Sequence, residues 1–168
     1  MDIRMLSSKY TVTRLKKEDI PDILVLCKAN PMYYRYCPPA VCTEVIRKDM
    51  TALPPGKGPE DKYYVGFFQG SRLIAVMDLI DGYPNADTGF IGFFMMNRKM
   101  QGRGIGSAIV EEACSFLKSI GKTAVMLGYV DGNPQSESFW KKNGFLPTGA
   151  VSHEELYDVI VMRRMLQA

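Results

Sequence analysis

The 168-residue chain is expected to fold as one α+β domain, residues 1–168, with a sheet of about seven strands between about four helices in three α/β/α layers. Two features of the pattern predict this. Strands follow one another in the first half of the chain, whereas strands and helices alternate in the second half. The composition agrees, since 46% hydrophobic residues in a chain of this length suffice for a sizeable core.

The first predicted elements are a short strand and two helices. Residues 10–15 form the strand, and apolar residues at helical spacing predict a helix over 17–29. Asn30-Pro31 ends that helix, and a second helix is expected over about 41–53. Proline and glycine then predict a loop over 53–61, which is either a lid over a site or a plain connection.

The remaining elements begin with a hairpin. Strands predicted at 63–69 and 73–80 are joined by Gly70-Ser71, which fits a two-residue turn. A turn over 81–85 and an apolar strand at 90–96 come next. The later elements are a helix from Gly104, a strand over 122–130, a helix from Asn133 and two closing strands at 146–151 and 157–165.

Charge and composition exclude several classes of protein. A net charge of +3, evenly spread, is too small for a nucleic-acid-binding protein. No apolar run is long enough to span a membrane, and the first residues lack the apolar core of a signal peptide, so we expect a cytoplasmic protein without a nucleic-acid or membrane partner. One histidine, His153, and four cysteines without C-x-x-C spacing make a metal site unexpected.

The most informative segment is the glycine turn, residues 101–107, which reads Gln-Gly-Arg-Gly-Ile-Gly-Ser. Backbone N–H groups at a helix N-terminus, together with the helix dipole, favour an anion such as a phosphate. The turn does not fit G-x-G-x-x-G, because the third glycine would be Ser107 or Ile109. A P-loop is excluded because Phe116 stands five residues before Gly121-Lys122-Thr123. A plain tight connection is the alternative.

Gln101, Gly104 and Gly106 do fit the pattern Q/R-x-x-G-x-G/A. At this place between strand and helix, the pattern resembles the pyrophosphate-binding motif of the GCN5-related N-acetyltransferase (GNAT) superfamily. A second block, Asn133 to Phe145, resembles that family's later motif, in which an asparagine opens a helix that ends in Gly-Phe. The resemblance implies a mixed, mostly antiparallel GNAT-like sheet. It also implies an enzyme that transfers an acetyl group from acetyl-CoA to a primary amine of a small molecule or peptide, by direct attack in a ternary complex.

The resemblance further implies how acetyl-CoA is held, without a metal. Backbone N–H groups of the glycine turn would bind the pyrophosphate, and the edge of the preceding strand would pair with the pantetheine arm. A backbone N–H near Met96 would meet the thioester oxygen. Asn133 would contact the pantetheine arm, cap its own helix, or do both. The cofactor-binding residues expected are Phe94, Met95, Met96, Gln101, Gly102, Arg103, Gly104, Ile105, Gly106, Ser107 and Asn133.

Two residues depart from the family pattern. Trp140 stands where many members have a tyrosine that protonates the leaving thiolate, and Phe90 stands where some have a glutamate base. An indole N–H donates a hydrogen bond but is no practical acid. We therefore expect Tyr129 as the acid, Asp78 as the base and Trp140 as a donor; a tyrosine packed in the sheet and a carboxylate at a solvated strand end are the alternatives. The departures also keep open an acyl-CoA-binding or regulatory module without turnover.

Acceptor recognition is expected in the segment between the first two helices. There Tyr33, Tyr34 and Arg35 would line a pocket for a carboxylate or an aromatic group. The alternative is a packed surface turn in which the tyrosines cover the core. The sequence names neither the acceptor amine nor the length of the acyl chain. The closing strands can pair with those of a second copy, as a homodimer would require.

Overall fold

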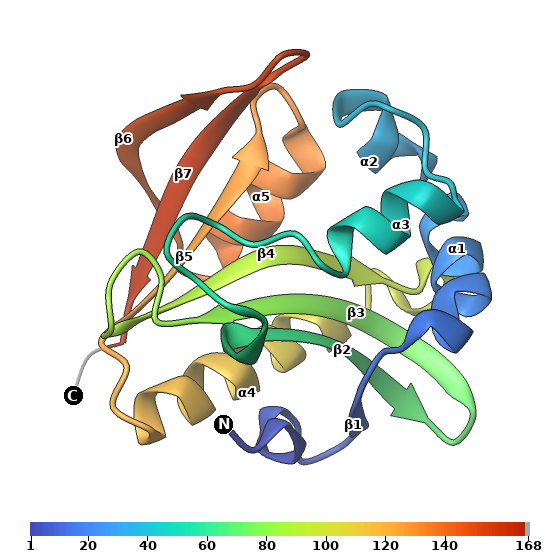
Figure 1. Cartoon of the computed structure of the whole chain (residues 1–168), viewed down its shortest axis with the longest axis horizontal. Coiled ribbons are helices and arrows are strands. Elements are labelled where there is room, and N and C mark those ends of the chain that lie inside the picture. The colour runs from blue at the N-terminus through green and yellow to red at the C-terminus, as the bar shows by residue number, and fades with distance from the viewer. Residues whose placement is uncertain (167–168) are drawn as a thin grey trace.

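A seven-stranded sheet forms the middle layer of the structure, a computed structural model that describes residues 1–166 (Figure 1). Its strands are β1 (Thr11–Arg14), β2 (Lys62–Gln69), β3 (Arg72–Asp81), β4 (Thr88–Met96), β5 (Ala124–Val130), β6 (Leu146–His153) and β7 (Asp158–Met165). They lie in the order β1-β2-β3-β4-β5-β7-β6. All neighbours are antiparallel except β4 and β5, which run parallel. The predicted α+β class with a mixed, mostly antiparallel sheet is confirmed.

Helices flank this sheet. Within residues 1–166 the α-helices are α1 (Ile20–Lys28), α2 (Pro31–Tyr36), α3 (Thr43–Asp49), α4 (Ile105–Ser119) and α5 (Pro134–Lys142). Short 3-10 helices are η1 (Ile3–Leu6), η2 (Lys17–Asp19), η3 (Pro59–Asp61) and η4 (Arg98–Met100). None of the helices in this part of the chain is long and apolar enough to cross a membrane.

The helix α2 is the one that the sequence did not predict. Pro31 ends α1, but its fixed φ also suits the first position of a new helix, where no backbone N–H is required. The helix expected over 41–53 is shorter, ending at Asp49, because Leu53 precedes Pro54 and a residue before proline avoids helical conformation. The predicted β2–β3 hairpin is confirmed, since Gln69 pairs with Arg72 across the turn.

The two faces of the sheet carry separate apolar cores. On one face, buried residues of α4 pack with Trp140 of α5 and with Met77 of β3. On the other face, α1 and α3 contribute Ile23 and Ile46, which pack with Val76 of β3. Neighbouring residues of a strand point to opposite faces, so β3 serves both cores. The result is three layers, with helices on both sides of the sheet.

The two central strands, β4 and β5, pair only over their first residues. Their parallel register runs from Thr88 opposite Ala124 to Ile91 opposite Leu127, and residues 92–96 and 128–130 lie beyond it. At the same point the β3–β4 register shifts, so that Gly92 is an extra residue on β4. A β-bulge of this kind bends its strand. The strands therefore separate and open a space in the middle of the sheet.

Candidate functional site

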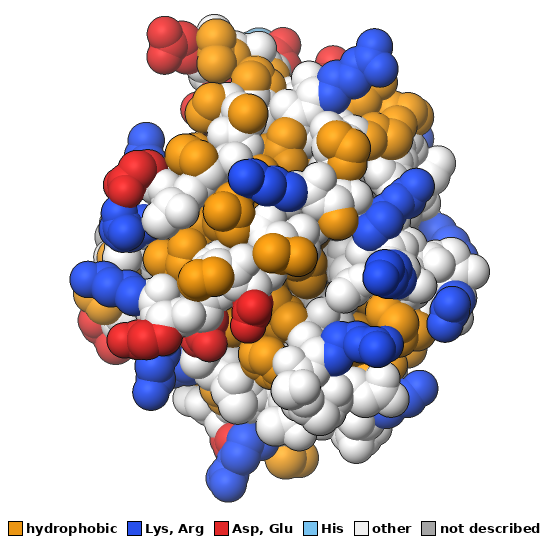
Figure 2. All heavy atoms as spheres, turned by 90° about the vertical axis from the view of Figure 1, so that its right-hand side faces the viewer, with side chains coloured by type: hydrophobic (Ala, Val, Ile, Leu, Met, Phe, Trp, Pro, Cys, Tyr) orange, Lys and Arg blue, Asp and Glu red, His pale blue; other side chains and the backbone are white. Residues whose placement is uncertain are grey.

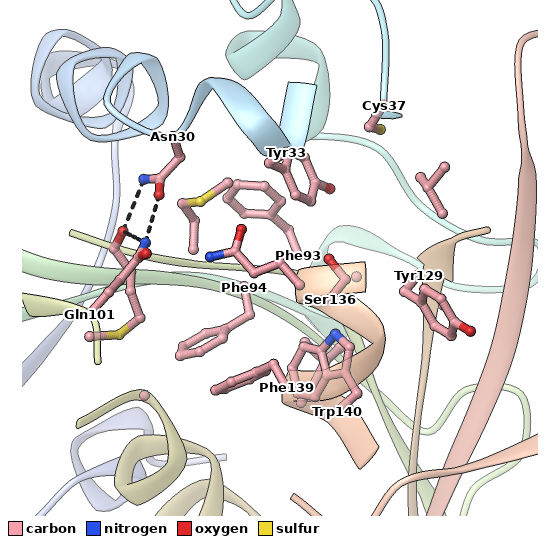
Figure 3. Close-up of a pocket in the computed structure, with 18 of the residues that line it drawn as sticks. Asn30, Tyr33, Cys37, Phe93, Phe94, Gln101, Tyr129, Ser136, Phe139 and Trp140 are labelled. Carbon is pink, nitrogen blue, oxygen red and sulfur yellow. Dashed lines mark hydrogen bonds between the residues drawn. The ribbon is translucent and has the colours of Figure 1, made fainter. Parts of the chain in front are cut away.

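A cavity of about 510 Å³ occupies the place where β4 and β5 separate. It is lined by residues of both strands, of α2, α5 and β7, and of the glycine turn. Figure 3 shows Tyr33 on one side of it and Phe139 and Trp140 on the opposite side.

The outer face that carries α1, α2 and α3 has Lys and Arg gathered on one half and hydrophobic side chains over its middle (Figure 2).

The glycine turn presents backbone N–H groups to this cavity. The first helical hydrogen bond of α4 runs from Ala108 N to Gly104 O (3.0 Å), and the N–H groups of residues 105–107 have no partner among the described residues. Gly104 is the N-cap, with φ +75°, and no atom lies within 4 Å of a Cβ built there. Gly102, Gly104, Gly106 and Ser107 line the cavity. The turn thus has the geometry of an anion site at a helix N-terminus.

The side chain of Gln101 is engaged inside the protein. Its Nε2 donates to Asn30 Oδ1 (2.6 Å) and to Met96 O (3.3 Å). Asn30, only 7% exposed, donates in turn to Met96 O (3.0 Å) and Leu26 O (2.9 Å). The bonds among Asn30, Gln101 and Met96, dashed in Figure 3, tie the glycine turn and the end of β4 to the end of α1. Asn30 was not predicted, because its partner Gln101 is 71 residues away in the chain.

The edge of β4 forms one wall of the cavity. Gly92, Phe93, Phe94, Met95 and Met96 all line it. On the side of β5, this stretch has no pairing strand, because the register with β5 ends at Ile91. Three of the residues predicted to contact a cofactor, 94–96, therefore lie on an unpaired strand edge within the cavity.

The first turns of α5 form the opposite wall. Asn133 is 2% exposed, and its Oδ1 accepts from the N–H groups of Gln135 and Ser136 (3.2 Å each). It therefore acts as the N-cap and does not line the cavity, whereas Gln135 and Ser136 do. These two were missed, although their place directly after a capped Asn-Pro pair was a usable signal.

Trp140 lines the cavity one helical turn after Ser136. Its ring packs edge-on against Phe139 (4.9 Å between centroids) and Phe145 (5.2 Å), which fixes its orientation. The indole nitrogen lies on the side of the ring nearest Ser136 (Figure 3). No residue in the described part of the chain accepts a hydrogen bond from it. The predicted donor is thus oriented with its N–H available.

The predicted acid, Tyr129, is among the residues that line the cavity, but its hydroxyl points away from Trp140 in Figure 3. Burial raises its pKa, and Glu137 raises it further. Glu137 does not line the cavity. The orientation of this hydroxyl therefore does not favour a role beside Trp140.

The predicted base, Asp78, lies just outside the cavity lining. Its Oδ2 accepts from Lys62 Nζ (2.7 Å), and a Cβ at Gly92 would lie 2.6 Å from Oδ2. Burial raises the pKa of Asp78 to about 6, against the opposing effect of Lys62. The carboxylate is thus buried behind the β4 bulge and paired, rather than on a solvated strand end.

Of the three residues expected to recognise an acceptor, the structure brings only Tyr33 to the cavity. Tyr34 packs with the core between α1 and α3 and the sheet, and Arg35 is exposed on the outer side of α2. Cys37 and Tyr157 line the cavity beside Tyr33 and were not predicted. Tyr157 lies between β6 and β7, 124 positions after Tyr33, so no local pattern connects the two.

Comparisons with known proteins agree with this geometry. The model of the Acetyltransferase (GNAT) family matches residues 29–145. An acetyltransferase from Thermus thermophilus has a TM-score of 0.74 at 18% identity, over 94% of this chain and 97% of that one. The PaiA N-acetyltransferase from Thermoplasma acidophilum, solved with coenzyme A, has a TM-score of 0.66 at 18% identity, over 92% and 97%.

A third similar structure is an acetyltransferase from Salmonella typhimurium that modifies the N-terminal serine of the 50S ribosomal subunit protein L7/L12. Its TM-score is 0.72 at 14% identity, over 96% of this chain and 98% of that one. No curated protein sequence matches the chain. At these identities the structural likeness establishes the fold.

Proposed function

Because the chain belongs to the acetyltransferase (GNAT) family, we propose that it transfers an acetyl group from acetyl-CoA to a primary amine by direct attack in a ternary complex. One observation carries this proposal. The N–H groups at the start of α4 and the unpaired edge of β4 meet in one cavity. The former suit a pyrophosphate, and the latter suits an extended chain that contains amides.

The residues present fit acetyl-CoA. Gly102 and Gly104 have positive φ and leave open space where a Cβ would stand, so that backbone N–H groups of the glycine turn can approach a diphosphate. Residues 94–96 offer backbone groups for the pantetheine amides. Arg103, exposed on the turn, adds positive charge. In this arrangement Gln101 and Asn133 act indirectly, by holding the turn and by capping α5.

The chemistry follows from these positions. Acetyl-CoA supplies a thioester whose carbonyl carbon accepts a nucleophile. The neutral amine nitrogen forms a bond to that carbon, the C–S bond breaks, and its electron pair leaves with the sulfur as a thiolate. The proton that the nitrogen loses passes to water. Positioning of the two reactants in one cavity is the main catalytic contribution, on the order of 7–11 kcal/mol in ideal model reactions.

Within this proposal Trp140 donates a hydrogen bond to the sulfur of the leaving group. Its fixed ring and unpartnered N–H support that role, and a hydrogen bond to a charged group contributes about 1.5–3 kcal/mol. Asp78 is paired with Lys62 and lies outside the lining. Since Tyr129 also points away from Trp140, water rather than a side chain carries the protons.

Thermal unfolding with acetyl-CoA, CoA, NAD and ATP tests the ligand. A ligand at a hundred times its dissociation constant stabilises the folded state by about 2.7 kcal/mol. We expect a shift with acetyl-CoA and CoA alone, followed by thiol release when an amine is added. A shift in Tm without thiol release for any amine would instead favour an acyl-CoA-binding module without turnover. Trp140 and Phe90, which stand where many family members have a tyrosine acid and some have a glutamate base, are the residues that support this alternative. If neither acetyl-CoA nor CoA shifts the Tm, the proposal is refuted.

A further inference from the structure

The cavity is almost free of charged side chains. Lys142 is the one charged residue that lines it within residues 1–166, and no carboxylate does. Lys142 follows Phe139 by one helical turn, and the Phe139 ring lies 3.3 Å from a Cβ placed at Gly106. Lys142 therefore stands near the end of α5, one turn after the ring that packs against the glycine turn. The end lined by Tyr33 and Tyr157, where an acceptor amine would enter, has no charged side chain in its lining. Two carboxylates lie outside that lining: Asp78, which is paired with Lys62 behind Gly92, and Asp49, which raises the pKa of both tyrosines.

The acceptor end is instead lined by aromatic and aliphatic groups. Tyr33 of α2 packs edge-on against Phe93 of β4, with 5.8 Å between ring centroids. Phe90 packs in the same way against Tyr83 at 5.3 Å. Tyr157 and Val159, from the β6–β7 turn and β7, complete this end. Its walls are thus apolar surfaces with few polar groups.

The hydroxyl groups at this end remain neutral. Burial raises the pKa of Tyr33 well above its ordinary value. A hydrogen bond with the Cys37 thiol and burial together raise the pKa of Tyr157. Both phenols are consequently hydrogen-bond donors and acceptors, not counter-ions. They suit an amide or carbonyl group of the acceptor rather than a second positive charge.

An amine that enters such a space must do so without its proton. A buried cation without a partner loses its hydration and gains no compensating charge, so the neutral form is favoured. An α-amino group has an ordinary pKa of about 7.7–8.0, whereas a lysine side chain has about 10.4. Near pH 7.5 the neutral fraction of the α-amino group is larger by roughly 200-fold. The uncharged cavity therefore discriminates between amines by their basicity.

We propose that the acceptor is an α-amino group next to an amide carbonyl, on a residue with an uncharged side chain, rather than a lysine side chain or a polyamine. This rests on the acetyl transfer proposed above. The neutral nitrogen forms the N–C bond, sulfur leaves with the C–S electron pair, and the single proton lost by nitrogen passes to water. A peptide N-terminus and a free amino-acid amide share this chemistry.

The test compares amines with the full-length protein and acetyl-CoA, by thiol release near pH 7.5. One peptide, Ala-Phe-Ala-Ala amide, has only an α-amine. A second, N-acetyl-Ala-Lys-Ala-Ala amide, has only a lysine amine. Spermidine represents polyamines, and alaninamide and phenylalaninamide represent small α-amines. We expect kcat/KM for the α-amine peptide to exceed that for the lysine peptide by about 100-fold or more.

The pH profile gives an independent readout. The rate with an α-amine should level off above about pH 8, and the rate with the lysine peptide should still rise toward pH 10. Comparing kcat/KM for the α-amine peptide with kcat/KM for alaninamide and phenylalaninamide shows whether the acceptor is a peptide N-terminus or a free amino-acid amide. A kcat/KM for spermidine or for the lysine peptide equal to or higher than that for the α-amine peptide would overturn the proposal. That result is expected if the aromatic rings bind the ammonium group directly, by cation–π contact.

A charge introduced into the acceptor end tests the cause. Phe90→Glu adds a carboxylate to the lining and should reduce the preference for the α-amine to about tenfold or less. Phe90→Leu removes the ring without adding charge and should keep the preference. Stabilisation by acetyl-CoA reports whether each variant folds and binds. If the unmodified protein binds acetyl-CoA but prefers the lysine peptide, only the proposed acceptor class is refuted. If it neither binds acetyl-CoA nor releases thiol with any amine, the proposed acetyl transfer is refuted as well.

Discussion

Replacing Gly104 with aspartate places a carboxylate directly in the proposed anion site. Gly104 has φ +75° and open space around the position of a Cβ, so the substitution causes no clash within the protein. Its own cost is the left-handed conformation of a residue with a side chain, about 1–2 kcal/mol. The effect on a bound pyrophosphate is electrostatic and additional. A charge about 5 Å away, at an effective dielectric constant of about 20, opposes binding by about 3 kcal/mol.

That energy corresponds to a dissociation constant roughly 150-fold higher. Acetyl-CoA at a hundred times the original constant should stabilise the unmodified protein by about 2.7 kcal/mol, or about 5–11 °C in Tm. The same concentration should stabilise Gly104→Asp by only about 0.3 kcal/mol, a shift of about 1 °C. The measurement is the difference in Tm with and without acetyl-CoA for each protein.

Gly121→Asp is the matched control. Gly121 also has positive φ, +92°, and open space around a Cβ, but it follows the other end of the 15-residue helix α4. The two ends are about 22 Å apart, well beyond the Debye length of about 8–10 Å. Gly121→Asp should have a lower Tm than the unmodified protein yet keep its full increase in Tm with acetyl-CoA. Gly104→Asn, which adds a side chain of the same size without the charge, shows how much of the lost shift in Gly104→Asp is electrostatic. A full shift in Gly104→Asp would show that the glycine turn does not bind the anion.

Three further predictions concern the cavity and its supports. Trp140→Phe should lower kcat about 10- to 100-fold while the KM for acetyl-CoA is unchanged, because it removes one donor to a charged sulfur; steady-state kinetics of Trp140→Tyr, which keeps a donor, should show a smaller loss. Since burial raises the folded-state pKa of Asp78 to about 6 from 3.8, the folded protein binds more protons than the unfolded chain, and stability should fall by up to about 3 kcal/mol as pH rises from about 4 to 6. Denaturant unfolding should show this slope flattened in Asp78→Asn, and a slope of opposite sign would mean that Lys62 outweighs burial. Asn30→Ala should destabilise the protein by about 1–3 kcal/mol and weaken acetyl-CoA binding, because Gln101 loses the partner that holds the glycine turn; unchanged stability would contradict the role of this network.

Local features of the sequence were sufficient for part of the site. A glycine-rich turn between a strand and a helix has one main structural outcome, so the N–H groups at the start of α4 followed from residues 101–107 alone. Trp140 also follows, because it is one helical turn from Ser136 on a helix whose start Asn133 and Pro134 define. Asn133 shows the limit of this reasoning, since the sequence allowed both a cap and a ligand contact. The structure has the cap, with the side chain turned to its own backbone.

Other features depend on contacts between distant residues. Asn30 acts through Gln101, 71 positions away, and Tyr157 reaches the cavity only because β7 pairs with β5. Asp78 was predicted as a base, with a carboxylate at a solvated strand end as the alternative. In the structure its partner Lys62 lies on the neighbouring strand, and both residues are buried. Tyr34 and Arg35 adjoin Tyr33 in sequence, yet helical geometry turns the three side chains in different directions.

The sequence by itself determined the order of the seven strands, the hairpin and the glycine turn, because these depend on periodicity and on the conformations open to glycine and proline. Only the tertiary structure decided that β4 and β5 separate after Ile91 and that α2 and the β6–β7 turn line one end of the cavity without a charged side chain. Strand pairing and the β-bulge at Gly92 are set by packing against both cores at once. Residues far apart in the chain determine that packing, and no local pattern encodes it.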